Sequence, residues 1–343
     1  ILGTPMYRAI KERYPDSTIT FLTFANNKAL LERIEFVDEI ICLRTTRLRY
    51  FIWDALTAIV KLCKKKIDVV IDMEFLAKVS TIISWLSGAK IKIGFYVKQI
   101  WRADILTHRV YFNHYKHTRD IFLALVKPLG IDNVCTDIIP PKVYHADLQE
   151  AEEQLRVKGF SLYDGCLIGV NMNASEICLE RRWPQENFIR LINDIASKED
   201  VLFCLIGSPS ESAYVRIGFR MLDEAAKRRT ADLCGKLSLG GLIAFLSKIK
   251  LLITNDSGPL HIADSLGTPT VSFFGPESPV IYGSLGKGNT IFYDGYLYCS
   301  PCLNVYNTKT AVCDGDNQCM KRIQVGEAEE AVMAELRDIR SRS

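Results

Sequence analysis

The sequence predicts an α/β protein made of two doubly wound domains, each a parallel sheet with helices on both faces. Short apolar runs of strand length alternate with longer amphipathic stretches, and this alternation occurs twice along the chain. The consecutive prolines Pro140 and Pro141 separate the two series and are typical of a linker. The chain has 343 residues, 48% of them hydrophobic, which is enough to fill two cores of ordinary size.

The first domain is expected over residues 1–145. Its strands are predicted at the apolar runs of residues 19–24, 39–43, 68–71 and 90–95. Helices are predicted at residues 50–62 and 77–86, because the apolar residues there repeat at helical spacing.

The second domain is expected over residues 146–325. Its strands are predicted at residues 166–171, 201–207, 251–254 and 270–274. Helices are predicted at residues 146–158, 186–196, 211–227 and 239–247. Residues 326–343 form a predicted C-terminal helix, with apolar side chains at Val332, Met333, Leu336 and Ile339.

Several classes of protein are disfavoured by the sequence. It contains no run of about 18 uncharged apolar residues, so a membrane-spanning helix is not expected. It has neither an initiating Met nor a basic leader, so we expect the chain to begin inside a domain. Seven of its 11 cysteines are scattered, mostly in apolar stretches, as in a cytoplasmic protein kept reduced.

Charge is distributed unevenly between the halves. Residues 1–145 hold 22 Lys and Arg against 14 Asp and Glu, whereas the remainder holds 21 against 26. The basic half contains Arg44, Arg47 and Arg49, and the run at residues 64–66. Either this half meets an anionic partner or its surface is merely solvated. No nucleic-acid motif accompanies the basic residues, so a nucleic-acid partner is not expected.

The most informative motif lies within residues 254–276. An apolar strand leads through Asp256, Ser257 and Gly258 into a predicted helix that carries His261. The free N–H groups of a helix N-terminus attract anions, and a glycine there lets a ligand approach the backbone closely. His261 follows one helical turn later, on the side that faces the same ligand. This stretch therefore predicts an anion cradle.

Five motifs follow one another in the second half of the chain: R-R-W-P at 181–184, G-S-P-S-E at 207–211, G-K-L-S-L at 235–239, D-S-G-P-L-H at 256–261 and F-G-P at 274–276. In the same order they resemble the motifs K-x-W-P, G-x-P-x-E, a segment that closes over the base, D-[ST]-G-x-x-H and F/Y-G-P. These are the motifs of glycosyltransferase family 9, the family of the ADP-heptose:lipopolysaccharide heptosyltransferases. The first half matches more loosely. The resemblance thus extends over nearly the whole chain.

The resemblance implies a GT-B fold, in which two Rossmann-like domains face each other across a cleft. The first domain would bind the acceptor and the second the nucleotide sugar. The implied activity is inverting transfer of heptose from ADP-heptose to the inner core of lipopolysaccharide, without a cofactor. The implied acceptor is an anionic glycolipid, reached from the cytoplasm by peripheral contact with the inner membrane. Alternatives are transfer of another nucleotide sugar, and a non-catalytic nucleotide-binding protein.

The resemblance also assigns roles to individual residues. Arg181 aligns with a phosphate-binding lysine of the family, and Ser257 and Gly258 contact the same phosphates. Glu211 binds the ribose and Leu237 flanks the adenine. The roles of the remaining two residues follow from chemistry: Asp256 orients a neighbour or touches the sugar, and His261 donates a hydrogen bond to the leaving group.

Each of these residues also has a structural interpretation. Asp256 with Ser257 is compatible with a simple helix cap, and Glu211 with an exposed carboxylate at a helix start. His261 alone resembles an ordinary structural histidine. Arg181 resembles a surface cation, because the adjacent Arg182 carries the same charge.

The general base is expected outside the sequence. In the family a Gly-Asp pair precedes the first helix, and its aspartate is the expected base that activates the acceptor hydroxyl. Counting back from Thr4 and Pro5 places that aspartate just upstream of Ile1. The catalytic base is therefore unknown within this chain.

Four cysteines cluster near the C-terminus, in a loop at residues 299–319. Cys299, Cys302, Cys313 and Cys319 give the spacing C-x2-C-x10-C-x5-C. Such soft ligands at short spacing suggest a structural zinc or iron–sulfur site, and free thiols or two disulfides are the alternatives. The role of such a site would be structural, locking the loop that follows the F-G-P segment.

Overall fold

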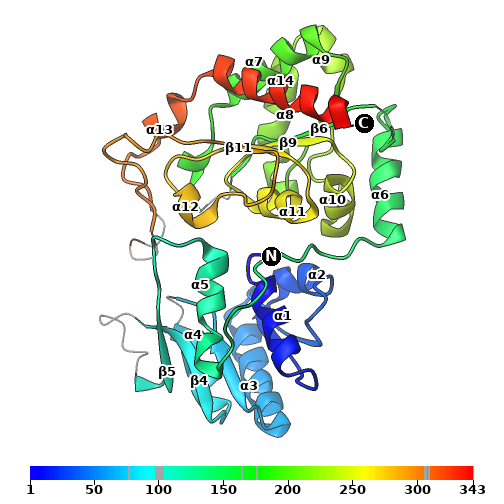
Figure 1. The fold of residues 1–343 in the computed structure, drawn as a ribbon. Coiled ribbons are helices and arrows are strands. Elements are labelled where there is room, and N and C mark those ends of the chain that lie inside the picture. Colours follow the sequence, from blue (N-terminus) through cyan, green and yellow to red (C-terminus); the bar gives the residue numbers. More distant parts are fainter. Residues whose placement is uncertain are drawn as a thin grey trace. The chain divides into compact units, whose positions relative to one another are not determined.

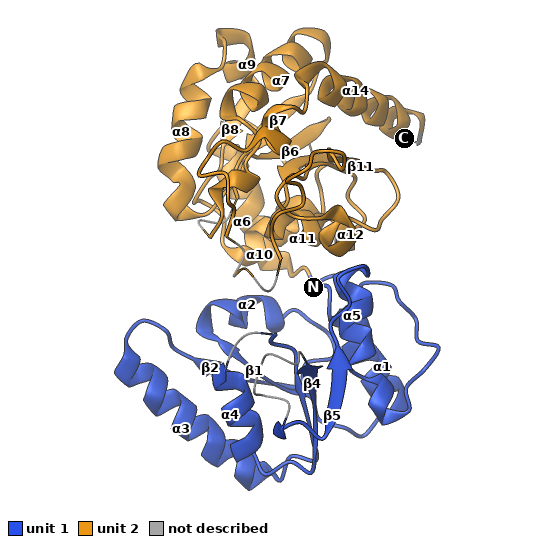
Figure 2. Ribbon diagram, turned by 90° about the vertical axis from the view of Figure 1, so that its left-hand side faces the viewer, with its two compact units in different colours: residues 1–142 blue, residues 143–343 orange. Residues whose placement is uncertain are grey.

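A computed structural model describes residues 1–75, 78–96, 104–163, 165–174, 177–304, 307 and 310–342. Contacts between residues divide the chain into two compact units, Ile1–Lys142 and Val143–Ser343 (Figure 2). The division falls next to the prolines Pro140 and Pro141.

Unit 1 consists of short parallel strands and helices. Its strands are β1 (Thr20–Phe24), β2 (Glu39–Leu43), β3 (Val69–Asp72), β4 (Ile91–Tyr96) and β5 (His108–Tyr111). Its helices are α1 (Thr4–Arg13), α2 (Lys28–Leu31), α3 (Leu48–Lys65), α4 (Lys78–Leu86) and α5 (Thr118–Ala124), with 3₁₀ turns at Ala25–Asn27 and Lys127–Leu129. The described strands form two sheets, β1-β2 and β3-β4-β5, in which every pairing is parallel.

Unit 2 is larger and more regular. Its strands are β6 (Leu167–Asn171), β7 (Leu202–Leu205), β8 (Thr230–Asp232), β9 (Leu251–Asn255), β10 (Thr270–Phe273) and β11 (Asn289–Phe292). Its helices are α6 (His145–Arg156), α7 (Gln185–Lys198), α8 (Ser212–Met221), α9 (Glu224–Arg228), α10 (Leu239–Leu246), α11 (Gly258–Leu266), α12 (Pro279–Tyr282), α13 (Gln318–Lys321) and α14 (Val325–Arg342), with 3₁₀ turns at Leu179–Arg181 and Pro209–Glu211.

The six strands of unit 2 form one parallel sheet in the order β11-β10-β9-β6-β7-β8. Counted from β6, this is the 3-2-1-4-5-6 order of dinucleotide-binding folds. Every residue of β6 and β9 is buried, as expected for central strands covered on both faces. Helices α7 and α14 cover one face of the sheet, and α10 and α11 cover the other (Figure 1).

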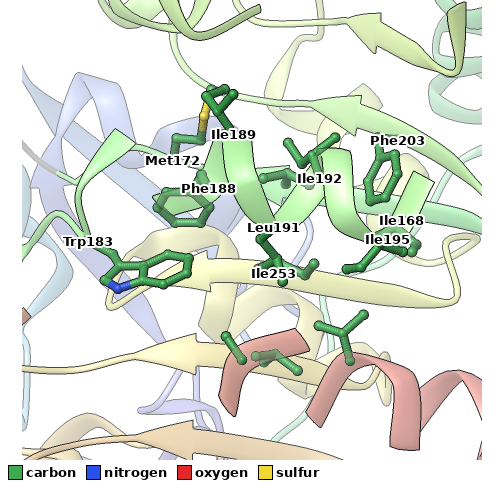
Figure 3. Packing of buried hydrophobic residues seen from close by; sticks show 14 of the residues in the cluster. Ile168, Met172, Trp183, Phe188, Ile189, Leu191, Ile192, Ile195, Phe203 and Ile253 are labelled. Atoms are coloured by element: carbon green, nitrogen blue, oxygen red, sulfur yellow. The ribbon is translucent and has the colours of Figure 1, made fainter. Parts of the chain in front are cut away.

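The core of unit 2 lies between the sheet and α7. Apolar residues of α7 recur at helical spacing, and Phe188, Leu191, Ile192 and Ile195 are fully buried. They pack against strand residues such as Ile253 and beside Trp183 (Figure 3). Trp183 also stacks on Phe273, with ring centroids 4.2 Å apart. The core therefore extends to the loop that precedes α7.

The structure differs from the expected elements in a few places. The helix expected at residues 211–227 is broken, because Leu222 is extended and Asp223 caps the separate helix α9. Strands β5, β8 and β11 were not expected, and residue 77 of an expected helix lies outside the described residues. None of the helices in the described ranges combines the length and apolar character needed to cross a membrane.

Candidate active site

The candidate site lies where β6 and β9 end in unit 2. These strands are neighbours in the sheet, but the chain proceeds from β6 to β7 on one side and from β9 to β10 on the other. Open parallel sheets bind ligands outside the carboxyl ends of their strands at such a switch point. Asn171 is the last residue of β6, and Asn255 is the last of β9.

A network of amide and hydroxyl groups joins the ends of these two strands. The Asn171 Nδ2 group donates to Ser257 Oγ at 2.9 Å and to Thr254 Oγ1 at 3.1 Å. The two hydroxyl oxygens are themselves 3.0 Å apart. Ser257 is therefore held in place by side chains from both strands.

Helix α11 begins directly after this network. Ser257 is its N-cap and has extended backbone angles, but its side chain makes no capping hydrogen bond. The Ser257 side chain therefore does not cap the helix. A Cβ atom added to Gly258 would meet no other atom within 4 Å among the described residues. The first turn of α11 thus faces open space, which a ligand needs in order to reach the backbone.

Arg181 and Asp256 form an ion pair at the same place. Arg181 Nη1 lies 3.2 Å from Asp256 Oδ2, and the two side chains are only 16% and 6% exposed. The Nε atom of Arg181 is buried without a hydrogen-bond partner in the described part of the chain. Arg181 is therefore not an ordinary surface cation.

Arg182 has different surroundings from its neighbour. Its guanidinium lies over the ring of Tyr214, 4.3 Å from the centroid, and donates to the Ala174 carbonyl oxygen at 3.4 Å. The two adjacent arginines are thus distinct, and only Arg181 meets the residues at the start of α11.

The loop that carries Arg181 is fixed by the core. Asn255 Oδ1 accepts the backbone N–H of Trp183 at 2.9 Å, and the Trp183 indole donates to the Ile323 carbonyl oxygen at 3.1 Å. Asn255 Nδ2 also donates to the carbonyl oxygens of Met172 and Asn173. A fully buried asparagine therefore joins three segments around the site.

His261 lies on α11, three residues after Gly258, and is half-buried. Its ring is tilted against that of Tyr282, with centroids 6.4 Å apart. Tyr282 is the last residue of α12, which follows the F-G-P segment. The histidine therefore lies close to the helix that follows the F-G-P segment.

Glu211 and Leu237 follow the carboxyl ends of β7 and β8. Glu211 Oε2 accepts the Ser208 backbone N–H at 2.7 Å and the Ser208 hydroxyl at 2.8 Å, so this carboxylate closes a capping box. Leu237 is half-buried just before α10, where Ser238 caps the helix. Asn173 connects this side to the centre by donating from Nδ2 to the Ile206 carbonyl oxygen at 3.0 Å.

The cysteine-rich loop packs on the F-G-P segment. The backbone N–H groups of Cys302 and Leu303 donate to the Pro276 carbonyl oxygen at 3.0 and 2.8 Å. The Ser300 hydroxyl donates to the Gly275 carbonyl oxygen at 2.7 Å. A Cβ atom on Gly275 would lie 2.6 Å from Met320 Sδ, so a larger residue here would require the Met320 side chain to shift. These contacts hold the loop on the segment.

Cys299, Cys302, Cys313 and Cys319 line one cavity of about 180 Å³. All four are free thiols. Burial raises the pKa of the Cys302 and Cys313 thiols and raises that of Cys319 to about 12. Within the described ranges no group of three or more His, Cys, Asp or Glu side chains is placed to hold a metal ion. The zinc or iron–sulfur site suggested by the spacing is therefore not supported.

The site contains residues that the sequence analysis missed. Asn171, Asn173, Thr254 and Asn255 carry its polar network, yet they look like ordinary residues at strand ends. The signal that could have identified them is their position in the sequence, because each ends or follows a predicted strand. Polar side chains at the carboxyl ends of adjacent central strands indicate a switch-point site.

Comparison with known proteins agrees with this geometry. The sequence model of glycosyltransferase family 9 (heptosyltransferase) matches residues 56–312. Lipopolysaccharide heptosyltransferase 2 of Escherichia coli is 23% identical over 295 residues, which is 81% of this chain and 80% of that protein. The enzyme of the same name from Salmonella typhimurium is 27% identical over 160 residues, which is 46% of this chain and 45% of that protein.

Solved structures share the fold over nearly the whole chain. A family 9 glycosyl transferase from Veillonella parvula has a TM-score of 0.83 at 21% identity, covering 98% of this chain and 93% of that one. The E. coli ADP-heptose lipopolysaccharide heptosyltransferase II has a TM-score of 0.77 at 19% identity, covering 98% and 95%. The fold is thus of the GT-B class. The family model spans well over half of the sequence, so this chain belongs to glycosyltransferase family 9 and is a glycosyltransferase.

Proposed function

We propose that this chain transfers heptose from ADP-heptose to the inner core of lipopolysaccharide, with inversion at the anomeric carbon. Two groups of proteins support the choice of donor. The relatives from Escherichia coli and Salmonella typhimurium are named as lipopolysaccharide heptosyltransferases. Among the solved structures with the same fold, one is named as an E. coli heptosyltransferase with ADP and another as one with an ADP-heptose analogue.

The observation that carries the proposal is the placement of the Arg181–Asp256 pair beside Ser257 and Gly258. Transfer of a sugar from a nucleotide diphosphate leaves negative charge on the departing β-phosphate. A buried guanidinium, a hydroxyl and a helix N-terminus all stabilise such charge, and they do so without a metal ion. We propose that these groups stabilise the charge on the ADP that leaves, and that His261 donates a further hydrogen bond to it.

The pair with Asp256 leaves N–H groups of Arg181 for binding a phosphate. A guanidinium carries five N–H bonds, and the pair with Asp256 uses Nη1. The Nε atom is buried and unpaired within the described residues. We infer that Asp256 orients the arginine, while the remaining N–H groups bind phosphate oxygens side by side.

The nucleoside would lie along the ends of β7 and β8. Only Oε2 of Glu211 is engaged by Ser208, so Oε1 is available to a ribose hydroxyl. Leu237 offers an apolar side chain to the adenine. In this arrangement unit 2 binds the donor, and unit 1, with its excess of basic residues, binds an anionic glycolipid acceptor. The proposed location is the cytoplasm, at the inner membrane.

Thermal unfolding with ADP, UDP and GDP tests the donor, because a ligand that binds only the folded state raises Tm. We expect ADP at a hundred times its Kd to add about 2.7 kcal/mol of stability. A preference for UDP would remove the heptosyltransferase proposal in favour of another nucleotide sugar. No shift with any nucleotide would favour a non-catalytic protein. Transfer is then measured with ADP-heptose and a defined core acceptor.

A further inference from the structure

Helix α3 of unit 1 carries a row of apolar residues on the side that faces solvent. Ile52, Leu56 and Val60 recur every four residues along it and are each at least half exposed. Trp53 lies beside them and is 68% exposed. The opposite side packs into a buried cluster through Ala58 and Leu62. Packing within unit 1 therefore explains one side of the helix and leaves the other unexplained.

Helix α4 repeats this arrangement. Its buried residues are Thr81, Ile83 and Ser84. Its exposed residues are all apolar except for Lys78, and they are Val79, Ile82, Trp85 and Leu86. Trp85 is 59% exposed, which is unusual for so large an apolar side chain.

The two exposed rows belong to one surface. Helices α3 and α4 lie side by side (Figure 2), and Ile83 packs in the same buried cluster as Ala58 and Leu62. The Cys63 thiol donates to the Leu86 carbonyl oxygen at 3.2 Å, which joins the C-terminal ends of the helices. We call this the α3–α4 surface; its residues are Ile52, Trp53, Leu56, Val60, Val79, Ile82, Trp85 and Leu86.

Basic residues accompany this surface. Residues 44–66 contain seven Lys and Arg and a single acidic residue, Asp54. Arg44 pairs with Asp54 at 2.7 Å, and Lys65 pairs with Glu39 at 2.7 Å. The other basic side chains of this stretch form no ion pair with a described residue, and all are exposed: Arg47, Arg49, Lys61, Lys64 and Lys66.

We propose that the α3–α4 surface docks on a lipid bilayer that carries anionic headgroups. Exposed apolar rows with tryptophan are typical of helices that lie in the membrane interface, where indole rings are favoured. Unpaired lysine and arginine side chains add attraction to anionic lipids. The combination supplies the two signals that stable attachment needs. This charge also argues against a second copy, because a two-fold contact would bring like charges together.

Docking would hold the enzyme at the membrane in which a glycolipid acceptor lies. This biological role rests on the proposed function. Binding to vesicles is nevertheless measured without any substrate. The probes are vesicles of phosphatidylcholine alone and of phosphatidylcholine with phosphatidylglycerol. We expect the protein to sediment with the anionic vesicles and to be released as salt is raised.

Two variants separate the apolar and the basic contributions. The double variant Trp53→Ser/Trp85→Ser should bind anionic vesicles at least about tenfold more weakly, because two large apolar side chains no longer leave water. Its matched control is Tyr163→Ser/Tyr296→Ser, which removes two exposed aromatic side chains of unit 2. Lys61→Gln/Lys64→Gln should weaken binding about fivefold for each charge. Its control is Lys248→Gln/Lys287→Gln, at exposed positions of unit 2.

Tryptophan fluorescence gives a direct readout of insertion. Trp183 is fully buried, so a blue shift on vesicle addition must come from other indoles. Trp101 lies outside the described residues and is replaced by Phe in the background used. The shift should occur with anionic vesicles and disappear in the Trp53→Ser/Trp85→Ser variant.

Three outcomes would overturn docking. The first is wild-type protein that ignores anionic vesicles, and the second is a tryptophan variant that binds them as wild type does. The third is a wild-type dimer that the tryptophan variant converts to monomer, which would make the surface a contact between copies. The Tm shift with ADP is measured in parallel. Vesicle binding without a shift from any nucleotide would sink the proposed function alone, and an ADP shift without vesicle binding would sink docking alone.

Discussion

Arg181 Nη1 lies 3.2 Å from Asp256 Oδ2, although the two residues are 75 positions apart in the sequence. One comes from the loop before α7 and the other from the end of β9. The carboxylate therefore holds the guanidinium at the start of α11. The adjacent Arg182 does not share this contact, so a substitution of Arg182 is a matched control for a substitution of Arg181.

Replacing Arg181 should weaken nucleotide binding. A hydrogen bond to a charged group contributes about 1.5–3 kcal/mol, so Arg181→Gln should raise the Kd for ADP about 10- to 100-fold. Calorimetric titration measures the change. Arg182→Gln is the control and should change the Kd less than about threefold, because that guanidinium lies over Tyr214. Equal losses in both variants would contradict a specific phosphate role for Arg181.

Gly258 should be needed by the ligand and not by the fold. A Cβ atom at this position meets nothing within 4 Å in the described structure, so Gly258→Ala should leave Tm unchanged or slightly raised. The same methyl group would occupy the space in which a phosphate approaches the helix, so we expect at least about tenfold weaker ADP binding, equivalent to ~1.4 kcal/mol.

The control for this glycine is Gly326→Ala. Gly326 also has open space around an added Cβ atom, but it lies at the start of α14, away from the phosphate motifs. Tm and ADP affinity are measured together for both variants. Unaltered ADP affinity in Gly258→Ala would place the diphosphate elsewhere.

Asn255 should matter mainly for stability. It is fully buried and connects Trp183, Met172 and Asn173 by hydrogen bonds. Asn255→Ala leaves several backbone groups unpaired, so we expect a loss of about 3 kcal/mol and a fall in Tm of about 6–12 °C. Asn187→Ala on α7 is the control, because its side chain makes no hydrogen bond to any described residue. Denaturant unfolding would contradict the role if the two variants lost equal stability.

Stability should fall in alkaline solution because of buried thiols. Burial raises the pKa of the Cys204 thiol well above its usual range and raises that of Cys319 to about 12. The folded state then holds protons that the unfolded state releases, so stability is fully present below about pH 9 and declines as pH rises toward 12. Tm measured from pH 7 to 10.5 checks this.

A Cys204→Ala variant should lose less stability as the pH rises, because it lacks the buried thiol of β7. At pH 7.5, iodoacetamide should modify the exposed Cys63 and Cys135 well before Cys319, because only a thiolate reacts readily. Rapid modification of Cys319 at this pH would contradict the raised pKa.

Much of the fold could be predicted from local pattern. Central strands such as β6 and β9 are continuous apolar runs because both of their faces are covered, and such runs are easy to find. Strands β8 and β11 were missed because they are short and lie at the edges of the sheet. The break between α8 and α9 was missed because Asp223 caps the second helix within a stretch that keeps helical composition.

The site was harder to predict than the fold. Motifs identified Arg181, Asp256, Ser257, Gly258 and His261, but not the ion pair between the first two. That contact depends on how the loop before α7 folds across β9, which is a tertiary property. The asparagines were missed because an amide has no distinctive local signal. Their meaning appears only when strand order places Asn171 beside Ser257.

The anchoring of Trp183 has a thermodynamic consequence for the donor site. Asn255 accepts its backbone N–H and Ile323 accepts its indole N–H. Its ring stacks on Phe273. The segment that presents Arg181 therefore loses its conformational freedom when unit 2 folds, and not when a nucleotide arrives. Association with ADP then proceeds with little further entropic penalty from the protein. Residues 181–183 behave as part of the rigid core, and they should exchange their amide hydrogens only when that core opens.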